Sequence, residues 1–369
     1  MNDFGRLLRT AARVSRTRYP GFIFGLPLAR AEIPVFTYHD VEPQGFARDL
    51  EFLRANGYRT LSLDEYLAAR NGGRRPPRAV LLTFDDARKS FSSVALPLLH
   101  TFESRAVLFA PTYWMERRAG SDDLFMSWPE LRACVESGLV DVQSHAHRHA
   151  LVATSQRLVD FADPAGLERF DIYDWPMRDR NGVEELGRPA PGTPIYRSIP
   201  LLSAPRRFVE NSELTQACRD FVHLHGRQEF FRRPDWRQRL TDEHRRLGER
   251  MPGRFMSDQA FRALIASEFE LSREQFRQHL GAAPTSIAYP WMLGSQLSLE
   301  LAKRHGLRTA FGVALDYRAE RRRMRLPIPV FGRLKSDWLQ FLPGQQRSNV
   351  LRAVGRKLSG IAKLQHLAH

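Results

Sequence analysis

The sequence predicts an α/β fold of the barrel kind, and two observations support it. Residues 80–84 form an uninterrupted run of apolar and β-branched side chains, as in a strand buried on both faces of a parallel sheet, and the run ends in Asp85 and Asp86. Over residues 33–150, similar apolar strands alternate with amphipathic segments, as βα units do. Barrel enzymes carry their chemistry at the carboxyl ends of such strands, so we expect the functional site beside the two aspartates.

The adjacent carboxylates favour a bound cation. Like charges repel, so one of the two aspartates would be protonated unless a cation lies beside them. A second apolar strand, residues 140–144, leads into His145 and His149, and this four-residue spacing puts both imidazoles on one side if a helical turn begins there. Asp86, His145 and His149 then form a metal-ligand set with open positions for water and substrate, and Asp85 is left to act as the base. The alternatives are surface histidines with a capping aspartate and, for Asp85, a structural ion pair.

Three stretches resemble motifs of one enzyme family. They are Thr-Phe-Asp-Asp at 83–86, Ser-His-x-x-x-His at 144–149 and Ile-Ala-Tyr-Pro-Trp at 287–291. In this order they resemble the first three motifs of the polysaccharide deacetylases with a NodB-homology domain, carbohydrate esterase family 4. The strand at 34–40 resembles the Tyr-His strand that begins many members. The resemblance covers about residues 33–158 and 264–333, and it implies a deformed (β/α) barrel.

The composition is that of a globular protein that favours anionic partners. The chain has 369 residues, 43% of them hydrophobic, and a formal net charge of +15. That charge suits a phospholipid surface, a phosphorylated lipid carrier, an acidic glycan or a nucleic acid and does not choose among them. Nucleic acid is the least favoured, because the positive charge is dispersed and no recognised module accompanies it. Cys134 and Cys218 are expected to be buried thiols, since two cysteines make no disulfide framework.

Residues 1–32 form a basic segment with arginines among helically spaced apolar residues. The apolar stretch at 21–28 is broken by Gly25 and Pro27, is too short to span a membrane and has no convincing cleavage site. We therefore expect a cytoplasmic protein. The basic segment either lies on an anionic membrane, packs on its own domain or stays solvated.

The other elements follow from helix and turn signals. Gly57 and Gly138 end two expected helices, and the proline-rich loop at 72–78 leads into the aspartate strand. The helices expected before residue 150 are 46–56, 64–69, 91–102 and 128–137, and a further strand is expected at 106–109, with another at 60–63.

A long segment interrupts this rhythm. Residues 157–263 contain closely spaced prolines and then two expected helices, at 211–222 and 236–250. Members of the family normally have a short helical link there. We therefore expect an insertion in a catalytic domain of residues 33–345, either a lid or acceptor-recognition element or a surface excursion. Beyond it we expect helix 261–279, strand 284–290, helix 297–305, strand 309–313, a closing segment at 326–330 and a basic amphipathic helix at 346–369 that docks on the protein or faces a membrane.

Two more residues are expected at the site. The resemblance puts Trp291 where a backbone N–H helps to hold the oxyanion, while its ring is equally suited to form an aromatic wall for sugar. His39 lies near the end of the first strand, 34–40, and either lines the barrel mouth or is a satisfied core histidine.

The chain also departs from the family pattern. Ala288 stands where one branch has an arginine that orients the catalytic aspartate, and Ala87 replaces the glycine that commonly follows the paired aspartates. The late leucine-histidine motif that supplies a general acid is not evident. His223 and His225 have the right look but lie in the insertion.

These features together predict a hydrolase of carbon–nitrogen bonds. We expect it to remove an N-acetyl or other N-acyl group from an amino sugar, in a polysaccharide or lipid-linked saccharide, with a divalent metal that is most simply Zn²⁺. An anionic membrane surface is a further partner only if the basic segment lies on a membrane, which is one of the three alternatives given above for that segment. The alternatives are a hydrolase of a small non-sugar amide and a non-catalytic protein of the same fold that binds glycan or a membrane surface.

Overall fold

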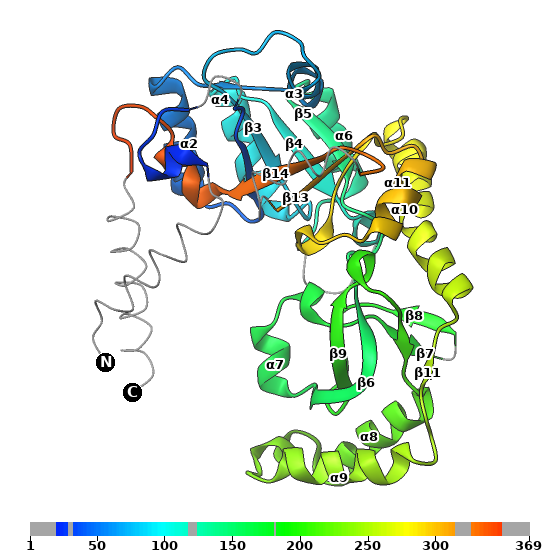
Figure 1. Cartoon of the computed structure of the whole chain (residues 1–369). Helices are drawn as coiled ribbons and strands as arrows, with labels where there is room; N and C mark the ends of the chain where they lie inside the picture. The colour runs from blue at the N-terminus through cyan, green and yellow to red at the C-terminus, as the bar shows by residue number, and fades with distance from the viewer. Residues whose placement is uncertain (1–19, 29–31, 117–123, 181, 314–325, 349–369) are drawn as a thin grey trace. The chain divides into compact units, whose positions relative to one another are not determined.

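The computed structural model describes residues 20–28, 32–116, 124–180, 182–313 and 326–348 (Figure 1). The chain forms two compact units. The first contains the chain up to His145, residues Arg273–Ala288 and the chain from Gly306 onward; the second contains Ala146–Ser272 and Tyr289–His305.

The first unit holds a closed parallel barrel. Neighbouring strands run in the order β1-β14-β13-β12-β5-β4-β3, and β1 also pairs with β3, which closes the ring. The predicted deformed (β/α) barrel is therefore confirmed, with seven strands in the ring and the short β2 (Arg59–Thr60) added to β3 outside it. The strands of the ring are β1 (Val35–Tyr38), β3 (Ala79–Phe84), β4 (Ala106–Ala110), β5 (Val140–Ser144), β12 (Ser286–Ala288), β13 (Thr309–Val313) and β14 (Val330–Lys335).

The helices between these strands begin and end at signals in the sequence. Ser62 and Glu65 form a reciprocal capping box at the start of α3, and Ser127 and Glu130 do the same for α6. The helix expected at 91–102 begins instead with a π-helical turn, η2, that continues into α4. The elements are α2 (Pro43–Ala55), α3 (Leu63–Arg70), η2 (Phe91–Ala95), α4 (Leu96–Thr101), α5 (Thr112–Glu116) and α6 (Trp128–Glu136).

The barrel has an aromatic core. Phe109 of β4 and Phe311 of β13 lie with ring centroids 5.4 Å apart, and Tyr66 of α3 contacts Phe331 of β14 edge-on at 5.3 Å. The guanidinium of Arg333 lies 5.6 Å from the centroid of the Phe109 ring, so this apolar interior also holds one buried cation of β14.

The second unit consists of two-stranded antiparallel sheets and helices. The predicted insertion at 157–263 lies within it, and the two helices expected there are α8 and α9. The sequence did not predict its strands: β9 begins at Pro194 and ends at Pro200, positions where a proline leaves the ladder intact. The elements are β6 (Leu151–Phe161), α7 (Pro164–Arg169), η3 (Ile172–Asp174), β7 (Arg178–Arg180), β8 (Val183–Glu185), β9 (Pro194–Pro200), η4 (Leu201–Ser203), β10 (Phe208–Val209), α8 (Ser212–Leu224), η5 (Arg227–Arg232), α9 (Trp236–Gly248) and β11 (Arg254–Phe255).

This unit has its own core. Cys218 and Val222 of α8 pack with Phe230, Trp236 and Leu240. Cys218 is free and buried, as is Cys134 in the barrel unit, so the expected buried thiols are confirmed. Burial raises the pKa of each thiol to about 12, which keeps both in the unreactive protonated form.

The remaining described elements precede or follow the strands of the barrel. They are η1 (Gly21–Phe24), α10 (Asp258–Leu280), η6 (Pro290–Met292), α11 (Gln296–Arg304) and η8 (Ser336–Phe341). Most of the predicted basic segment at 1–32 and of the helix at 346–369 lies outside the described residues. Within the described part of the chain, no helix is both long enough and apolar enough to cross a bilayer.

Candidate metal centre

The aspartate turn, residues 85–87, follows β3 directly. Asp86 has φ 70° and Ala87 has φ 47°, and both values lie in the left-handed region that favours glycine. The backbone N–H of Met126 donates to the carbonyl of Ala87 at 2.8 Å and holds the turn in place. Glycine adopts this backbone conformation freely, whereas alanine adopts it at some cost in strain.

Asp85 forms a bidentate ion pair with Arg333 inside the barrel. Nη1 donates to Oδ1 at 2.6 Å and Nη2 to Oδ2 at 2.7 Å, and both side chains are buried. Burial raises the pKa of Asp85, but the charges of Arg333 and His145 outweigh it and hold the pKa below its usual value. Asp85 is thus ionised at neutral pH and fixed in orientation.

Arg333 was not among the residues predicted for the site. The resemblance pointed to a guanidinium at position 288, where this chain has alanine, whereas the guanidinium beside Asp85 comes from β14. The available signal was a single arginine at 333 among the apolar residues and glycine of 330–334.

His39 lies beside this pair. Its Nε2 is 4.0 Å from Oδ2 of Asp85, and its side chain is 52% exposed, so it is a neighbour of the aspartate and not a core histidine. A role for His39 in the site stays a prediction.

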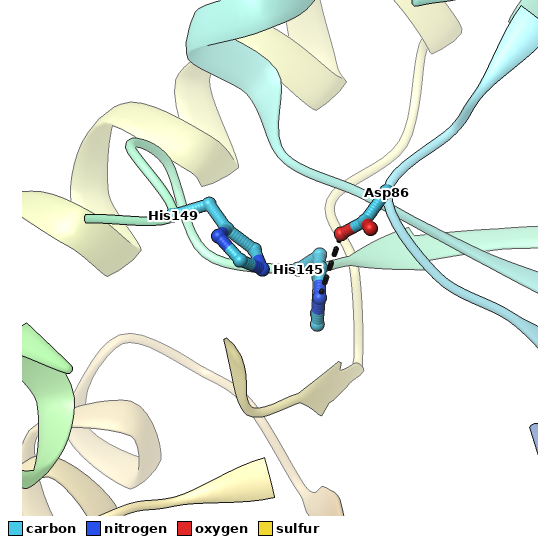
Figure 2. Close-up of side chains that lie close together, drawn as sticks. All are labelled: Asp86, His145 and His149. Carbon is cyan, nitrogen blue, oxygen red and sulfur yellow. Dashed lines mark ion pairs between the residues drawn. The ribbon is translucent and has the colours of Figure 1, made fainter. Parts of the chain in front are cut away.

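His145 follows β5 and is held at two points. Its backbone N–H donates to the carbonyl of Ala110 at 3.0 Å, and its ring Nδ1 lies 2.8 Å from the carbonyl of Ala288. A carbonyl oxygen only accepts, so Nδ1 carries the proton and Nε2 keeps its lone pair for a ligand. Nε2 lies 3.4 Å from Oδ1 of Asp86 (Figure 2). Burial lowers the pKa of His145, but Asp85 and Asp86 outweigh it and raise the pKa above its usual value.

His149 lies in an irregular loop and not in the helical turn considered from the spacing. Ala146 has φ 67° and His149 has φ 51°, so the loop reverses through two left-handed residues. Two aromatic rings flank the imidazole: Tyr173 stacks on it with centroids 3.9 Å apart, and Trp291 lies tilted at 4.3 Å. The side chain is buried.

The structure brings the three predicted ligands together. Asp86, His145 and His149 each offer one ligand atom, all three residues are buried, and these atoms lie within 4.8 Å of one another. Tetrahedral zinc with bonds of about 2.0–2.1 Å separates its ligand atoms by about 3.3 Å. The 3.4 Å between Asp86 and His145 matches this spacing, and one carboxylate with two imidazoles suits zinc and the neighbouring divalent transition metals. The donor set therefore fits a divalent cation.

The other predicted positions are less directly tied to this centre. Trp291 has φ 49° within η6, and its ring contacts His149; the proposed role of its backbone N–H is not tested by this contact. His223, on the last turn of α8, and His225, the C-cap of that helix, are exposed. His223 contacts Arg227, and His225 contacts the carbonyl of Phe221, so both contacts lie within their own segment. Neither histidine gains support as a general acid.

Comparison with known proteins agrees with the barrel and its motifs. Residues 72–161, which include Asp85, Asp86, His145 and His149, match the family model described as polysaccharide deacetylase. The barrel is of the polysaccharide deacetylase type. The deacetylase domain of BpsB from Bordetella bronchiseptica superposes with a TM-score of 0.52 at 20% identity, covering 84% of this chain and 98% of that one, which supports the deacetylase fold.

Two curated deacetylases are similar to part of this chain. The poly-beta-1,6-N-acetyl-D-glucosamine N-deacetylase of Escherichia coli K12 is 31% identical over 119 residues, and the enzyme of the same name from Staphylococcus epidermidis is 29% identical over 114 residues. These alignments cover 29% and 31% of this chain, but 18% and 39% of the relatives. The chain thus matches well under half the length of either relative.

Proposed function

We propose that this protein is a metal-dependent hydrolase that removes the N-acetyl group, or another N-acyl group, from an amino sugar of a glycan. One observation carries the proposal: a buried carboxylate and two buried imidazoles offer three ligand atoms within 4.8 Å, next to a second, ionised carboxylate. The deacetylase-type barrel and the match to the family model support the same reaction class.

The chain's own residues have distinct roles in this proposal. Asp86, His145 and His149 would hold the cation, which supplies polarisation of the amide carbonyl and a more acidic water. Asp85, oriented by Arg333, takes a proton from the attacking water. The Trp291 N–H donates to the developing oxyanion. The carbon–nitrogen bond then breaks as the leaving nitrogen takes up the proton that Asp85 removed. The acid formed gives up the second proton of the water, so acetate and the protonated amine leave and Asp85 is ionised again.

The substrate is proposed to be a polysaccharide. The two curated relatives are named for their action on poly-beta-1,6-N-acetyl-D-glucosamine, and this supports an acetylated glycan for this chain. Zinc is the proposed ion because of the donor set. A lipid-linked saccharide, an anionic membrane surface and a cytoplasmic location stay predictions.

Two departures from the family pattern favour the alternative of a non-catalytic binding protein with the same fold. They are the absent arginine at position 288 and the absent late histidine motif. Arg333 supplies a guanidinium to Asp85 from another strand, so the first absence no longer argues against catalysis.

The test compares three variants of the purified full chain. Asp85→Asn should lose deacylation of acetylated amino-sugar oligomers and keep its metal, whereas His145→Ala should lose stoichiometric metal. Asp141→Asn is the matched control, because Asp141 is a partly buried carboxylate of β5 that accepts the backbone N–H of Leu63 instead. Metal content is measured by elemental analysis and activity by amine release.

Each outcome decides a part of the proposal. Full activity in Asp85→Asn removes the base, and full metal content in His145→Ala removes the ligand set. Hydrolysis of small non-sugar amides but not of amino-sugar oligomers would favour the alternative enzyme.

A further inference from the structure

The histidine loop, residues 146–149, has a backbone that needs support. Two of its four residues, Ala146 and His149, have left-handed φ values without being glycine. Such residues persist where surrounding contacts determine the backbone path. The contacts that do so identify which parts of the chain set the position of His149.

Glu268 of α10 binds the backbone of this loop. Its Oε2 accepts the N–H of His147 at 3.1 Å and the N–H of Arg148 at 2.9 Å, and its Oε1 accepts Nη1 of Arg148 at 2.6 Å. The carboxylate is 1% exposed. Two consecutive N–H groups directed at one oxygen fix the orientation of the 146–147 and 147–148 peptide planes, so the backbone is held up to the residue before His149.

The side chain of Arg148 extends this support into the inserted segment. Its Nε donates to Oε2 of Glu184 on β8 at 2.8 Å. Oε1 of Glu184 also accepts Nη1 of Arg207 at 3.2 Å, and Arg207 is 1% exposed. The chain of charges therefore runs Glu268–Arg148–Glu184–Arg207, with buried residues at its two ends and partly buried ones between them. Its last two members belong to the insertion.

The insertion also contacts the imidazole itself. Tyr173 of η3 stacks on the His149 ring at 3.9 Å with an interplanar angle of 27°, and Trp291 packs on it at 4.3 Å. Glu268 thus fixes the backbone before His149, while the two aromatic side chains restrict the orientation of its ring.

We propose that Glu268, Arg148 and Glu184 are positioning residues for His149, and that the segment between the second and third motifs therefore forms the support of the metal site. This inference rests on the proposed function, because it assigns a purpose to the support only if His149 binds a cation. Metal sites need ligands held within about 0.5 Å of their productive geometry, and partners behind the ligands typically change metal affinity about 10–100-fold.

The test measures metal binding and not activity. Apo forms of the full-length wild type, Glu268→Gln and Glu184→Gln are titrated with Zn²⁺ against a chromophoric chelator, and the visible spectrum of each Co²⁺ form is recorded. Glu268→Gln should weaken Zn²⁺ binding about 10–100-fold and alter the Co²⁺ spectrum. Glu184→Gln should act in the same direction with a smaller loss, and Glu268→Asp should restore part of the affinity.

Glu210→Gln is the matched control. Glu210 is also a partly buried carboxylate of the second unit that accepts a backbone N–H, from Asp179 at 3.0 Å. Burial raises its pKa against the opposing charge of nearby Arg207, but no described hydrogen bond or ion pair joins it to Glu184 or to the histidine loop. The variant should lower thermal stability and leave Zn²⁺ affinity and the Co²⁺ spectrum unchanged.

The outcomes separate this inference from the proposed function. A wild type that binds no divalent ion overturns both. A wild type that binds, with Glu268→Gln and Glu184→Gln within about twofold of its affinity, overturns the inference alone, and so does an equal loss in Glu210→Gln. If Glu268→Gln does not fold, the result for Glu184→Gln decides, because that side chain is 27% exposed and tolerates the change better.

Discussion

The aspartate turn and the histidine loop each hold a predicted metal ligand in place, and the charged residues that support them have opposite signs. In each segment the ligand is a non-glycine residue with left-handed backbone angles, close to the end of a barrel strand. Asp86 comes shortly after β3, and His149 lies a few residues beyond β5. A buried cation, Arg333, supports the first through the side chain of Asp85. A buried anion, Glu268, supports the second through two backbone N–H groups.

The difference shows which property each support controls. Arg333 touches a carboxylate, so it controls the charge and direction of a proton acceptor. Glu268 touches peptide groups, so it controls the path of the chain that carries a ligand. Removing Arg333 should therefore affect hydrolysis more than metal binding, whereas removing Glu268 should weaken metal binding.

Arg333→Met gives the largest expected effect. Removing one partner of a buried ion pair leaves an uncompensated charge and typically costs about 3–5 kcal/mol of folding free energy. The pKa of Asp85 should rise, because burial is then opposed less, and hydrolysis should be lost while Zn²⁺ binding is kept. Urea unfolding, amine release and metal titration measure the three effects.

Arg333→Lys is the control for this change. It keeps a positive charge without the two-pronged contact and should recover stability more than activity. Loss of zinc affinity in Arg333→Met equal to that in Glu268→Gln would contradict the division between the two supports.

Asp49 of α2 extends the comparison to a partly buried acid whose side-chain hydrogen bonds come from neutral groups. Tyr38 and Gln340 each donate to it at 3.0 Å. Burial raises its pKa to about 6. The folded state then binds the proton more tightly than the unfolded state, so stability should fall by about 2 kcal/mol as the pH rises from 4 to above 6.

Asp49→Asn should remove this pH dependence. Urea unfolding of the wild type and the variant with a chelator present, at several pH values between 4 and 7, measures the difference, and Asp40→Asn serves as the exposed control. A wild type that becomes more stable relative to Asp49→Asn over this range would refute the prediction.

Glycine at Ala87 or Ala146 gives the smallest expected effect. Left-handed backbone costs a non-glycine residue about 1–2 kcal/mol, and the buried methyl group that glycine loses contributes about 0.8 kcal/mol. Each variant should therefore change the free energy of unfolding by less than about 1 kcal/mol, towards greater stability. Ala110→Gly, at a buried strand position without positive φ, should destabilise, and thermal unfolding compares the three. Equal destabilisation in all three would exclude strain as the distinction.

The sequence predicted the elements whose signals are local. The strand at 80–84, strand 309–313 and the helices α8 and α9 follow from apolar runs and helical periodicity, and the structure has them within a few residues of the expected bounds. The barrel fold was predicted from the alternation of apolar strands with amphipathic segments and from the order of the three family motifs.

The rest depended on contacts that no local pattern contains. Arg333 and Asp85 are 248 residues apart in the chain, and the loop at 146–149 takes its path from Glu268 and not from its own helix propensity. Prolines at 194 and 200 read as breaks, although they mark the two ends of β9. The convergence of Asp86, His145 and His149 was predicted from residue types, whereas the groups that hold them were not.

The position of the closing strand in the chain determines when, during synthesis, the barrel can close. β14 follows every other barrel strand in the chain, and it pairs with both β1 and β13. A nascent chain therefore keeps open edges on those two strands until ribosomal synthesis has passed Lys335, and open edges invite misassociation. The same late strand carries Arg333, the guanidinium that pairs with Asp85. The pairing of β14 that closes the ring therefore also fixes the charge and orientation of the proton acceptor.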